Sequence, residues 1–135
     1  MSKFLSTKYS TGAFNFAMLV LRVMTGILLM SHGYTKLVGF SKMQHTFYNF
    51  MGLGSTTSLV LIIFAEFFCS IFLILGLFTR FACIPIIIGM GVVVFSVTHG
   101  HIFSNGEKAA LFLTATITIL FCGPGRISVD GMIRK

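Results

Sequence analysis

The chain has 135 residues, of which 56% are hydrophobic and only 10% are charged, and its formal net charge is +7. Soluble domains carry about 25% charged residues, so thirteen charged side chains are too few to cover a water-soluble globule of this length. This composition disfavours a soluble enzyme and excludes a disordered or collagen-like chain. It predicts an all-α polytopic membrane protein with one domain over residues 1–135, because four spans of ~20 residues and their loops account for the length.

The first predicted span covers residues 14–33, an apolar run interrupted by Arg22. The run is longer than the h-region of a signal peptide, which has about 7–15 residues, and no small-residue cleavage site follows it. We therefore expect a retained transmembrane helix at this position.

A short amphipathic segment is expected between the first two spans. Apolar residues recur there at helical spacing: Phe40, Met43, Phe47, Phe50 and Met51. The segment is too short to cross a bilayer. The spacing predicts a short amphipathic helix that lies at the membrane interface or covers the end of the bundle.

Three further apolar runs predict the remaining spans of a four-helix bundle. They cover residues 58–78, 81–98 and 107–123. The link Thr79-Arg80 is so short that the second and third spans should form an antiparallel hairpin. Gly123-Pro124-Gly125 ends the fourth span, because proline and glycine stop helices.

The basic residues favour one orientation in the membrane. Six lie in segments on the side that carries both termini, namely Lys3, Lys8, Arg80, Arg126, Arg134 and Lys135, and three lie on the other, namely Lys36, Lys42 and Lys108. By the positive-inside rule, we expect both termini in the cytoplasm of a bacterial cell with the chain in the inner membrane. The lipid bilayer then explains the basic charge, and no basic stripe with interleaved aromatic residues indicates nucleic acid.

Arg22 and Glu66 are the two charges deep within the predicted spans, where an isolated charge is costly. Arg22 lies ~12 Å beyond Phe14 and Glu66 lies ~18 Å before Phe78, at 1.5 Å per residue. We therefore predict an intramembrane ion pair between Arg22 and Glu66. The pair either fixes the helix register or takes part in proton coupling or ligand anchoring.

A polar rim is expected at the outer membrane face. Its predicted members are His32, Lys36, His99, His101 and Glu107. Such a cluster suits an anion, a metal or a polar head group, but the His99-Gly100-His101 pair has no further ligand pattern beside it, so we expect no metal. Lys36 and Glu107 are expected to form an ion pair at this rim.

The remaining polar and sulfur-containing residues give weaker indications. Cys69, Cys83 and Cys122 are odd in number and form no C-x-x-C motif, so we expect three small buried hydrophobic residues. Asp130 stands among basic residues in the tail and is expected to cap a helix or to pair with Arg126.

Three stretches of the chain resemble the DoxX family of small bacterial membrane proteins. They are LRVMTGILLMSHGYTKLVGF in the first span, AEFFCSIFLILGLFTR in the second, and Glu107 followed by the closing GPGRISVD. The resemblance extends from about Leu21 to Asp130. The residues that carry over are Arg22, Gly26, Gly33, Lys36, Glu66, Gly76, Arg80, Glu107, Gly123, Gly125 and Asp130.

The resemblance implies a four-helix inner-membrane protein. Some members of the family are linked to quinone-reducing thiosulfate oxidation and others to membrane-associated oxidoreductase complexes. It therefore implies a subunit or accessory factor of a membrane redox system, with oxidoreductase subunits as partners and a quinone between the helices, while no cofactor motif is evident in the sequence. A carrier or binding protein for a small amphipathic molecule, a purely structural assembly protein, and a homo-oligomer stay open.

Overall fold

The computed structural model describes residues 2–49, 52–97, 99, 103 and 106–133, and these residues form helices and connecting turns. The four principal helices are α2 (Thr11–Val38), the continuous helix α4–η1–α5, α6 with its extension η2, and α7 (Glu107–Cys122). The second of these comprises α4 (Ser55–Ile63), the π-helical turn η1 (Phe64–Phe68) and α5 (Cys69–Leu75); the third comprises α6 (Thr79–Val92) and η2 (Val93–Val97). Three short helices complete the described chain: α1 (Ser2–Leu5), α3 (Phe40–Met43) and α8 (Val129–Ile133).

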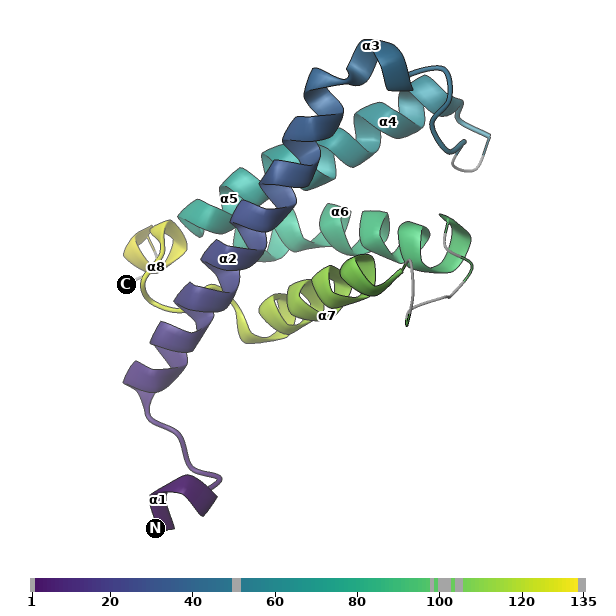
Figure 1. Ribbon diagram of the computed structural model, residues 1–135. Coiled ribbons are helices and arrows are strands. Elements are labelled where there is room, and N and C mark those ends of the chain that lie inside the picture. The colour runs from purple at the N-terminus through teal and green to yellow at the C-terminus, as the bar shows by residue number, and fades with distance from the viewer. Residues whose placement is uncertain (1, 50–51, 98, 100–102, 104–105, 134–135) are drawn as a thin grey trace.

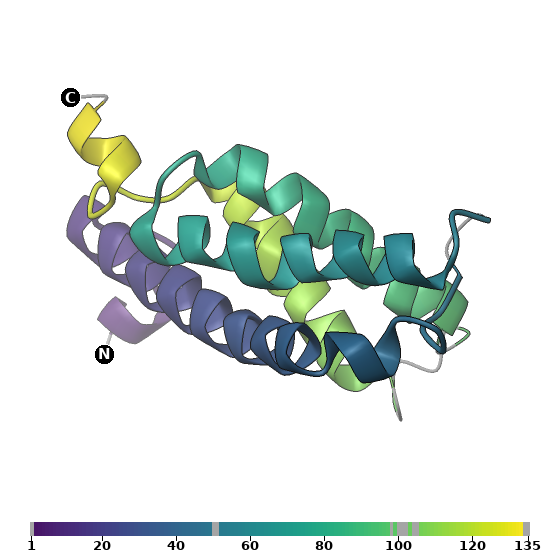
Figure 2. The ribbon, with the colours of Figure 1, turned by 90° about the horizontal axis from the view of Figure 1, so that it is seen from above.

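The principal helices form one bundle in which successive helices run in opposite directions (Figure 1). Helix α2 lies along α4–η1–α5, and α7 packs against both α6 and α2. Both termini lie at one end of the bundle, and α3 lies at the opposite end (Figures 1 and 2). The expected all-α bundle is confirmed.

The helix limits differ from the predicted spans by a few residues. Helix α2 begins at Thr11 because the hydroxyl of Ser10 accepts a hydrogen bond from the backbone N–H of Ala13 at 3.0 Å, which caps the helix. It continues five residues past the predicted end at Gly33, to Val38. The helix expected at 58–78 is shifted to Ser55–Leu75 and ends where Gly76 adopts a left-handed conformation with φ of 71°.

The amphipathic helix between the first two principal helices is shorter than its apolar spacing suggests. Only Phe40–Met43 is helical, and a turn follows at residues 44–46. Phe40, Met43 and Phe47 nevertheless pack against the hydrophobic core, as their spacing predicts. Phe50 and Met51 lie outside the described residues.

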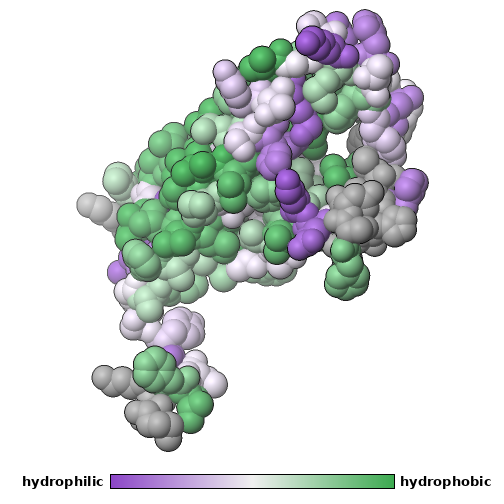
Figure 3. All heavy atoms as spheres, viewed as in Figure 1, coloured by the Kyte–Doolittle hydropathy of each residue, from purple (hydrophilic) through white to green (hydrophobic). Residues whose placement is uncertain are grey.

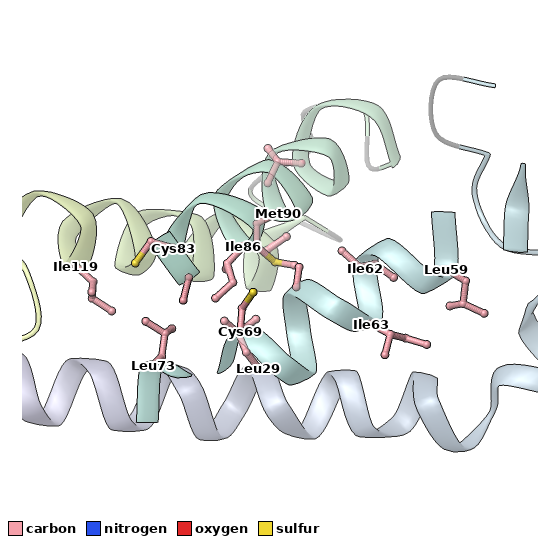
Figure 4. Packing of buried hydrophobic residues seen from close by; sticks show 14 of the residues in the cluster. Leu29, Leu59, Ile62, Ile63, Cys69, Leu73, Cys83, Ile86, Met90 and Ile119 are labelled. Carbon is pink, nitrogen blue, oxygen red and sulfur yellow. The ribbon is translucent and has the colours of Figure 1, made fainter. Parts of the chain in front are cut away.

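The hydrophobic core lies between the four principal helices (Figure 4). Leu29, Leu73, Cys83, Ile86 and Ile119 are fully buried there and come from α2, α5, α6 and α7. Burial of an aliphatic side chain of this size contributes about 1.5–3 kcal/mol when water is the alternative. In a bilayer the alternative is hydrocarbon, so close packing of the helices becomes the main source of their association.

Two glycines allow α2 to approach α4–η1–α5 closely. A Cβ atom at Gly33 would lie 2.7 Å from the backbone nitrogen of Phe67, and one at Gly26 would lie 3.0 Å from the backbone oxygen of Ser70. Gly76, just after α5, lies against the guanidinium of Arg22. These contacts fix the register of the two antiparallel helices: Arg22 is level with Gly76, and Gly33 is level with Glu66 and Phe67.

The exterior is mostly hydrophobic. Figure 3 shows a broad hydrophobic face, while hydrophilic side chains gather around α3 and the C-terminal end of α2. In the described part of the chain two helices, Thr11–Val38 and Ser55–Leu75, are long and apolar enough to cross a membrane, and Thr79–Phe95 is a shorter apolar helix.

Alanine at Gly33 should separate α2 from η1, because its Cβ would collide with backbone atoms that cannot rotate away. We expect Gly33→Ala to lower the free energy of unfolding by about 1–3 kcal/mol, the usual cost of overpacking, measured by denaturation in mixed micelles. Gly91→Ala is the matched control, since Gly91 is also helical but has open space where a Cβ would lie. Equal stability of the two variants would contradict the close helix contact.

Candidate functional site

Glu66 is buried in the π-helical turn η1 and forms an ion pair with Lys36 of α2. The Nζ atom of Lys36 lies 2.9 Å from Oε2 and 3.0 Å from Oε1 of Glu66, so the ammonium contacts both carboxylate oxygens. The side chain of Glu66 is 5% exposed and that of Lys36 is 22% exposed. Lys36 therefore neutralises the carboxylate while its own charge stays near the surface.

The π-helical turn has a second polar feature. The hydroxyl of Ser70 donates a hydrogen bond to the backbone oxygen of Glu66 inside the bundle. A π-helical turn widens the helix, and such turns occur frequently at functional sites. The side chain of Glu66 is therefore held on one side by Lys36, and its backbone is held by Ser70 one turn later.

The predicted pair between Arg22 and Glu66 is wrong, and the helix register explains why. Glu66 is level with Gly33, eleven residues from Arg22 along α2, which corresponds to ~16 Å. Helical side chains also incline toward the N-terminus of their own helix. Arg22 therefore reaches away from Glu66, whereas Lys36 reaches back toward it.

Arg22 binds the segment that follows α7. Its side chain is 2% exposed, and its Nη1 and Nη2 atoms donate hydrogen bonds to the backbone oxygens of Pro124 at 2.5 Å and Ile127 at 2.9 Å. Asp130 also interacts electrostatically with this guanidinium. Arg22 thus holds the C-terminal segment against α2 at the end of the bundle that carries both termini.

Asp130 caps the start of α6 from a distant part of the sequence. Its Oδ1 accepts a hydrogen bond from the backbone N–H of Phe78 and its Oδ2 accepts one from Thr79, both at 2.9 Å. The backbone N–H of Asp130 in turn donates to the oxygen of Gly76 at 2.8 Å. A carboxylate at a helix N-terminus satisfies free N–H groups and complements the helix dipole. The expectation of a capping role is therefore confirmed.

The residues at this end of the bundle form what we call the terminal cluster: Arg22, Gly76, Arg80, the segment Gly123–Ser128 and Asp130. Sequence reasoning missed two of its contacts. Asn15 accepts a hydrogen bond from the backbone N–H of Arg126 at 3.0 Å, and a Cβ atom at Gly76 would collide with Ser128. The one available signal was an amide residue, Asn15, inside an otherwise apolar run.

The predicted outer rim is assembled only in part. His32 is partly buried and packs its ring edge-on against Phe112 of α7, with centroids 5.6 Å apart, while His99 and Glu107 are exposed. Lys36 pairs with Glu66, so the expected ion pair with Glu107 is wrong. His101 lies outside the described residues, and among those described no group of three potential metal ligands occurs.

The cysteines differ from one another in exposure. Cys69 and Cys83 are buried in the core, as expected, but Cys122 is exposed at the end of α7. The expectation of three buried cysteines is therefore wrong for Cys122, because the helix ends there and turns the residue outward.

An apolar pocket of about 330 Å³ lies beside the π-helical turn, between α4–η1 and α6–η2. Twelve residues line it: Phe47, Tyr48, Ser58, Leu61, Ile62, Phe64, Ala65, Pro85, Ile88, Gly89, Val92 and Val93. Leu61, Phe64 and Ile88 are about half exposed, so the pocket opens to the hydrophobic exterior. Phe64 and Ala65 contribute to the pocket from the same turn that holds Glu66.

A family model described as DoxX matches residues 17–99, which is more than half of the chain. The chain belongs to the DoxX family. With its apolar helices, this membership identifies a membrane protein. The matched range contains Arg22, Gly33, Lys36, Glu66 and Arg80, but it ends before α7 and the closing segment at 123–130. No curated protein and no solved structure matches the chain.

Removal of either charge of the Lys36–Glu66 pair should destabilise the protein, and Lys36→Met should do so most, because it leaves the carboxylate of Glu66 buried and unpaired. We expect Lys36→Met to cost about 3 kcal/mol and Glu66→Gln to cost less, because Lys36 lies nearer the surface. The double variant should cost less than the sum of the two by at least about 1 kcal/mol. The free energy of unfolding in mixed micelles measures both effects.

The matched comparison uses Arg22→Met with Glu66→Gln. Because Arg22 and Glu66 contact different groups, their effects should add. The pairing of Glu66 with Lys36 would be contradicted if the substitutions at Arg22 and Glu66 had non-additive effects on the free energy of unfolding while those at Lys36 and Glu66 were additive.

Proposed function

We propose that this DoxX protein is a non-catalytic, multi-pass inner-membrane subunit or accessory factor of a membrane redox system. Its role is to bind a quinone or a quinone-like amphipathic molecule in the apolar pocket between α4–η1 and α6–η2. The single observation that carries this proposal is the pocket itself, which opens to the hydrophobic exterior and is lined by apolar side chains. The proposed role in a redox system rests on what the resemblance to the DoxX family implies.

The pocket suits a ligand that arrives through the bilayer. Hydrophobic molecules concentrate in hydrocarbon, and the half-exposed rim of Leu61, Phe64 and Ile88 gives them lateral access. Phe47 and Phe64 supply aromatic surface for a ring or a prenyl chain. Tyr48 supplies a phenolic hydroxyl that can donate a hydrogen bond to a carbonyl oxygen.

A bound quinone supplies electron and proton transfer, and the chain's own residues supply binding and shape. A Cβ atom at Gly89 would lie 2.8 Å from Cδ1 of Ile62 and 3.7 Å from Cβ of Ala65, so this glycine allows α6 to approach α4–η1 closely at the pocket wall. Glu66 lies in the same turn as two lining residues but pairs with Lys36 on the α2 side. The pair therefore supports the wall of the pocket from behind.

A second candidate is a binding protein for another small amphipathic molecule. Favouring it, Tyr48 and Ser58 are the two lining residues with hydroxyl groups, and the hydroxyl of Ser58 already donates to the backbone oxygen of Gly54 at 2.7 Å. A pocket with so few polar groups selects mainly for shape and apolar area.

The proposed topology places the four principal helices across the membrane, with both termini in the cytoplasm. Support comes from the excess of lysine and arginine on the side of the termini. Oxidoreductase subunits are the proposed partners.

Filling the pocket should weaken ligand binding without unfolding the protein. Leucine at Gly89 would project toward Ile62 and occupy the cavity, whereas leucine at Gly91, two residues further along α6, would project into open space. We expect Gly89→Leu to weaken binding of a short-chain quinone by at least about tenfold, or 1.4 kcal/mol, and Gly91→Leu to leave it unchanged. The measurements are titration calorimetry on purified protein and extraction of co-purified quinone.

Two results would count against the quinone proposal. Equal quinone binding by both variants would show that the pocket is not the site. Loss of a different co-purified amphipathic molecule in Gly89→Leu, with no quinone in the native protein, would favour the second candidate.

A further inference from the structure

A second cavity, of about 380 Å³, lies at the end of the bundle that carries both termini. Its lining comes from the start of α6, the end of α7 with the loop after it, and α8: Phe78, Thr79, Arg80, Phe81, Cys122, Gly123, Pro124, Gly125, Asp130 and Gly131. It shares no lining residue with the apolar pocket. We call it the Arg80 cavity, and its ligand has to be inferred separately from that of the apolar pocket.

Arg80 supplies a guanidinium that is free to bind a ligand in the Arg80 cavity. Its side chain is exposed and lies flat over Gly123, where a Cβ atom would be 3.0 Å from Nη2 and 3.5 Å from Cζ. In the part of the chain that the structure describes, no hydrogen bond or ion pair engages it. Glycine at position 123 thus lets the guanidinium rest on the loop.

Asp130 also lines this cavity, and its carboxylate already accepts hydrogen bonds. Both oxygens of Asp130 accept backbone hydrogen bonds from Phe78 and Thr79, and Asp130 also acts on the charge of Arg22. Two guanidinium groups and one carboxylate leave a local excess of one positive charge. The Arg80 cavity is therefore suited to an anion.

The surroundings of Arg80 favour an anion that carries an apolar tail. Phe78 is 60% exposed and Phe81 is 73% exposed, on either side of Arg80 at the first turn of an apolar helix. Exposed apolar rings on both sides of a cation suit a ligand that has an anionic head and an apolar tail. A phospholipid matches this arrangement, because its phosphate faces the guanidinium while its acyl chains pass the two rings.

We propose that the Arg80 cavity binds the phosphate of an anionic phospholipid, with Arg80 as its main contact. Guanidinium groups bind phosphate through two parallel hydrogen bonds, which an ammonium cannot reproduce. Because Asp130 and Arg22 hold α8 and the loop beside the cavity, a bound lipid also stabilises the terminal cluster. This proposal does not depend on the ligand of the apolar pocket.

The test reconstitutes the full chain in nanodiscs of phosphatidylcholine with and without phosphatidylglycerol. Native mass spectrometry counts retained lipid, and the midpoint of thermal unfolding reports stabilisation. We expect phosphatidylglycerol to be retained by the native chain and to raise its midpoint, and Arg80→Gln to retain it about tenfold more weakly, as loss of a charged hydrogen-bond pair predicts. Arg126→Gln, an exposed arginine at the same end, should behave like the native chain.

A second pair of variants and a comparison with inorganic phosphate complete the test. If Arg80→Gln does not fold, Arg80→Lys is compared with Arg126→Lys, and the proposal requires weaker retention in the former, because lysine lacks the fork of donors. Equal loss in matched Arg80 and Arg126 variants would show diffuse attraction to the surface and overturn the proposal. A full midpoint shift from inorganic phosphate in phosphatidylcholine discs would assign the cavity to a soluble anion and overturn it equally.

Discussion

The close contact between α2 and the α4–η1–α5 helix is the constraint on which the rest of the structure depends. Gly26 and Gly33 bring the two backbones within reach of each other, so the antiparallel pair has one register. Gly33 is then level with Glu66, and Arg22 is level with Gly76. The positions of both deep charges follow from this register.

The register places each deep charge beside groups that neutralise it or bind it by hydrogen bonds, because an unpaired charge is costly in hydrocarbon. Glu66 forms an ion pair with the ammonium of Lys36. Arg22 donates hydrogen bonds to backbone oxygens of the segment after α7 and also interacts with the charge of Asp130. The first arrangement supports the wall of the apolar pocket, and the second closes the end of the bundle next to the Arg80 cavity. The two polar arrangements of this DoxX protein therefore lie at different levels of the bundle, at Gly33 and at Arg22 of α2.

The sequence was sufficient for the fold but not for the partners of the charges. Composition and four apolar runs predicted an all-α bundle, and a carboxylate in a basic tail predicted that Asp130 either caps a helix or pairs with Arg126, of which the cap is found. The Arg22–Glu66 pair failed because depth was measured from assumed span ends, Phe14 and Phe78, whereas the glycine contacts shift the helices by several residues. The direction in which helical side chains incline would have favoured Lys36, but the backbone oxygens that bind Arg22 belong to a loop whose path no local pattern specifies.

Carbodiimide cross-linking of the native chain in membranes tests this register most directly. An apolar carbodiimide activates a carboxyl group in hydrocarbon, and an amine within contact distance then displaces the urea and forms an amide bond. With Nζ of Lys36 2.9 Å from the carboxylate of Glu66, peptide mass spectrometry should find a Lys36–Glu66 cross-link. Modification of Glu66 as an N-acylurea without that cross-link would contradict the account, since arginine forms no such amide and a partner other than Lys36 would then hold the carboxylate.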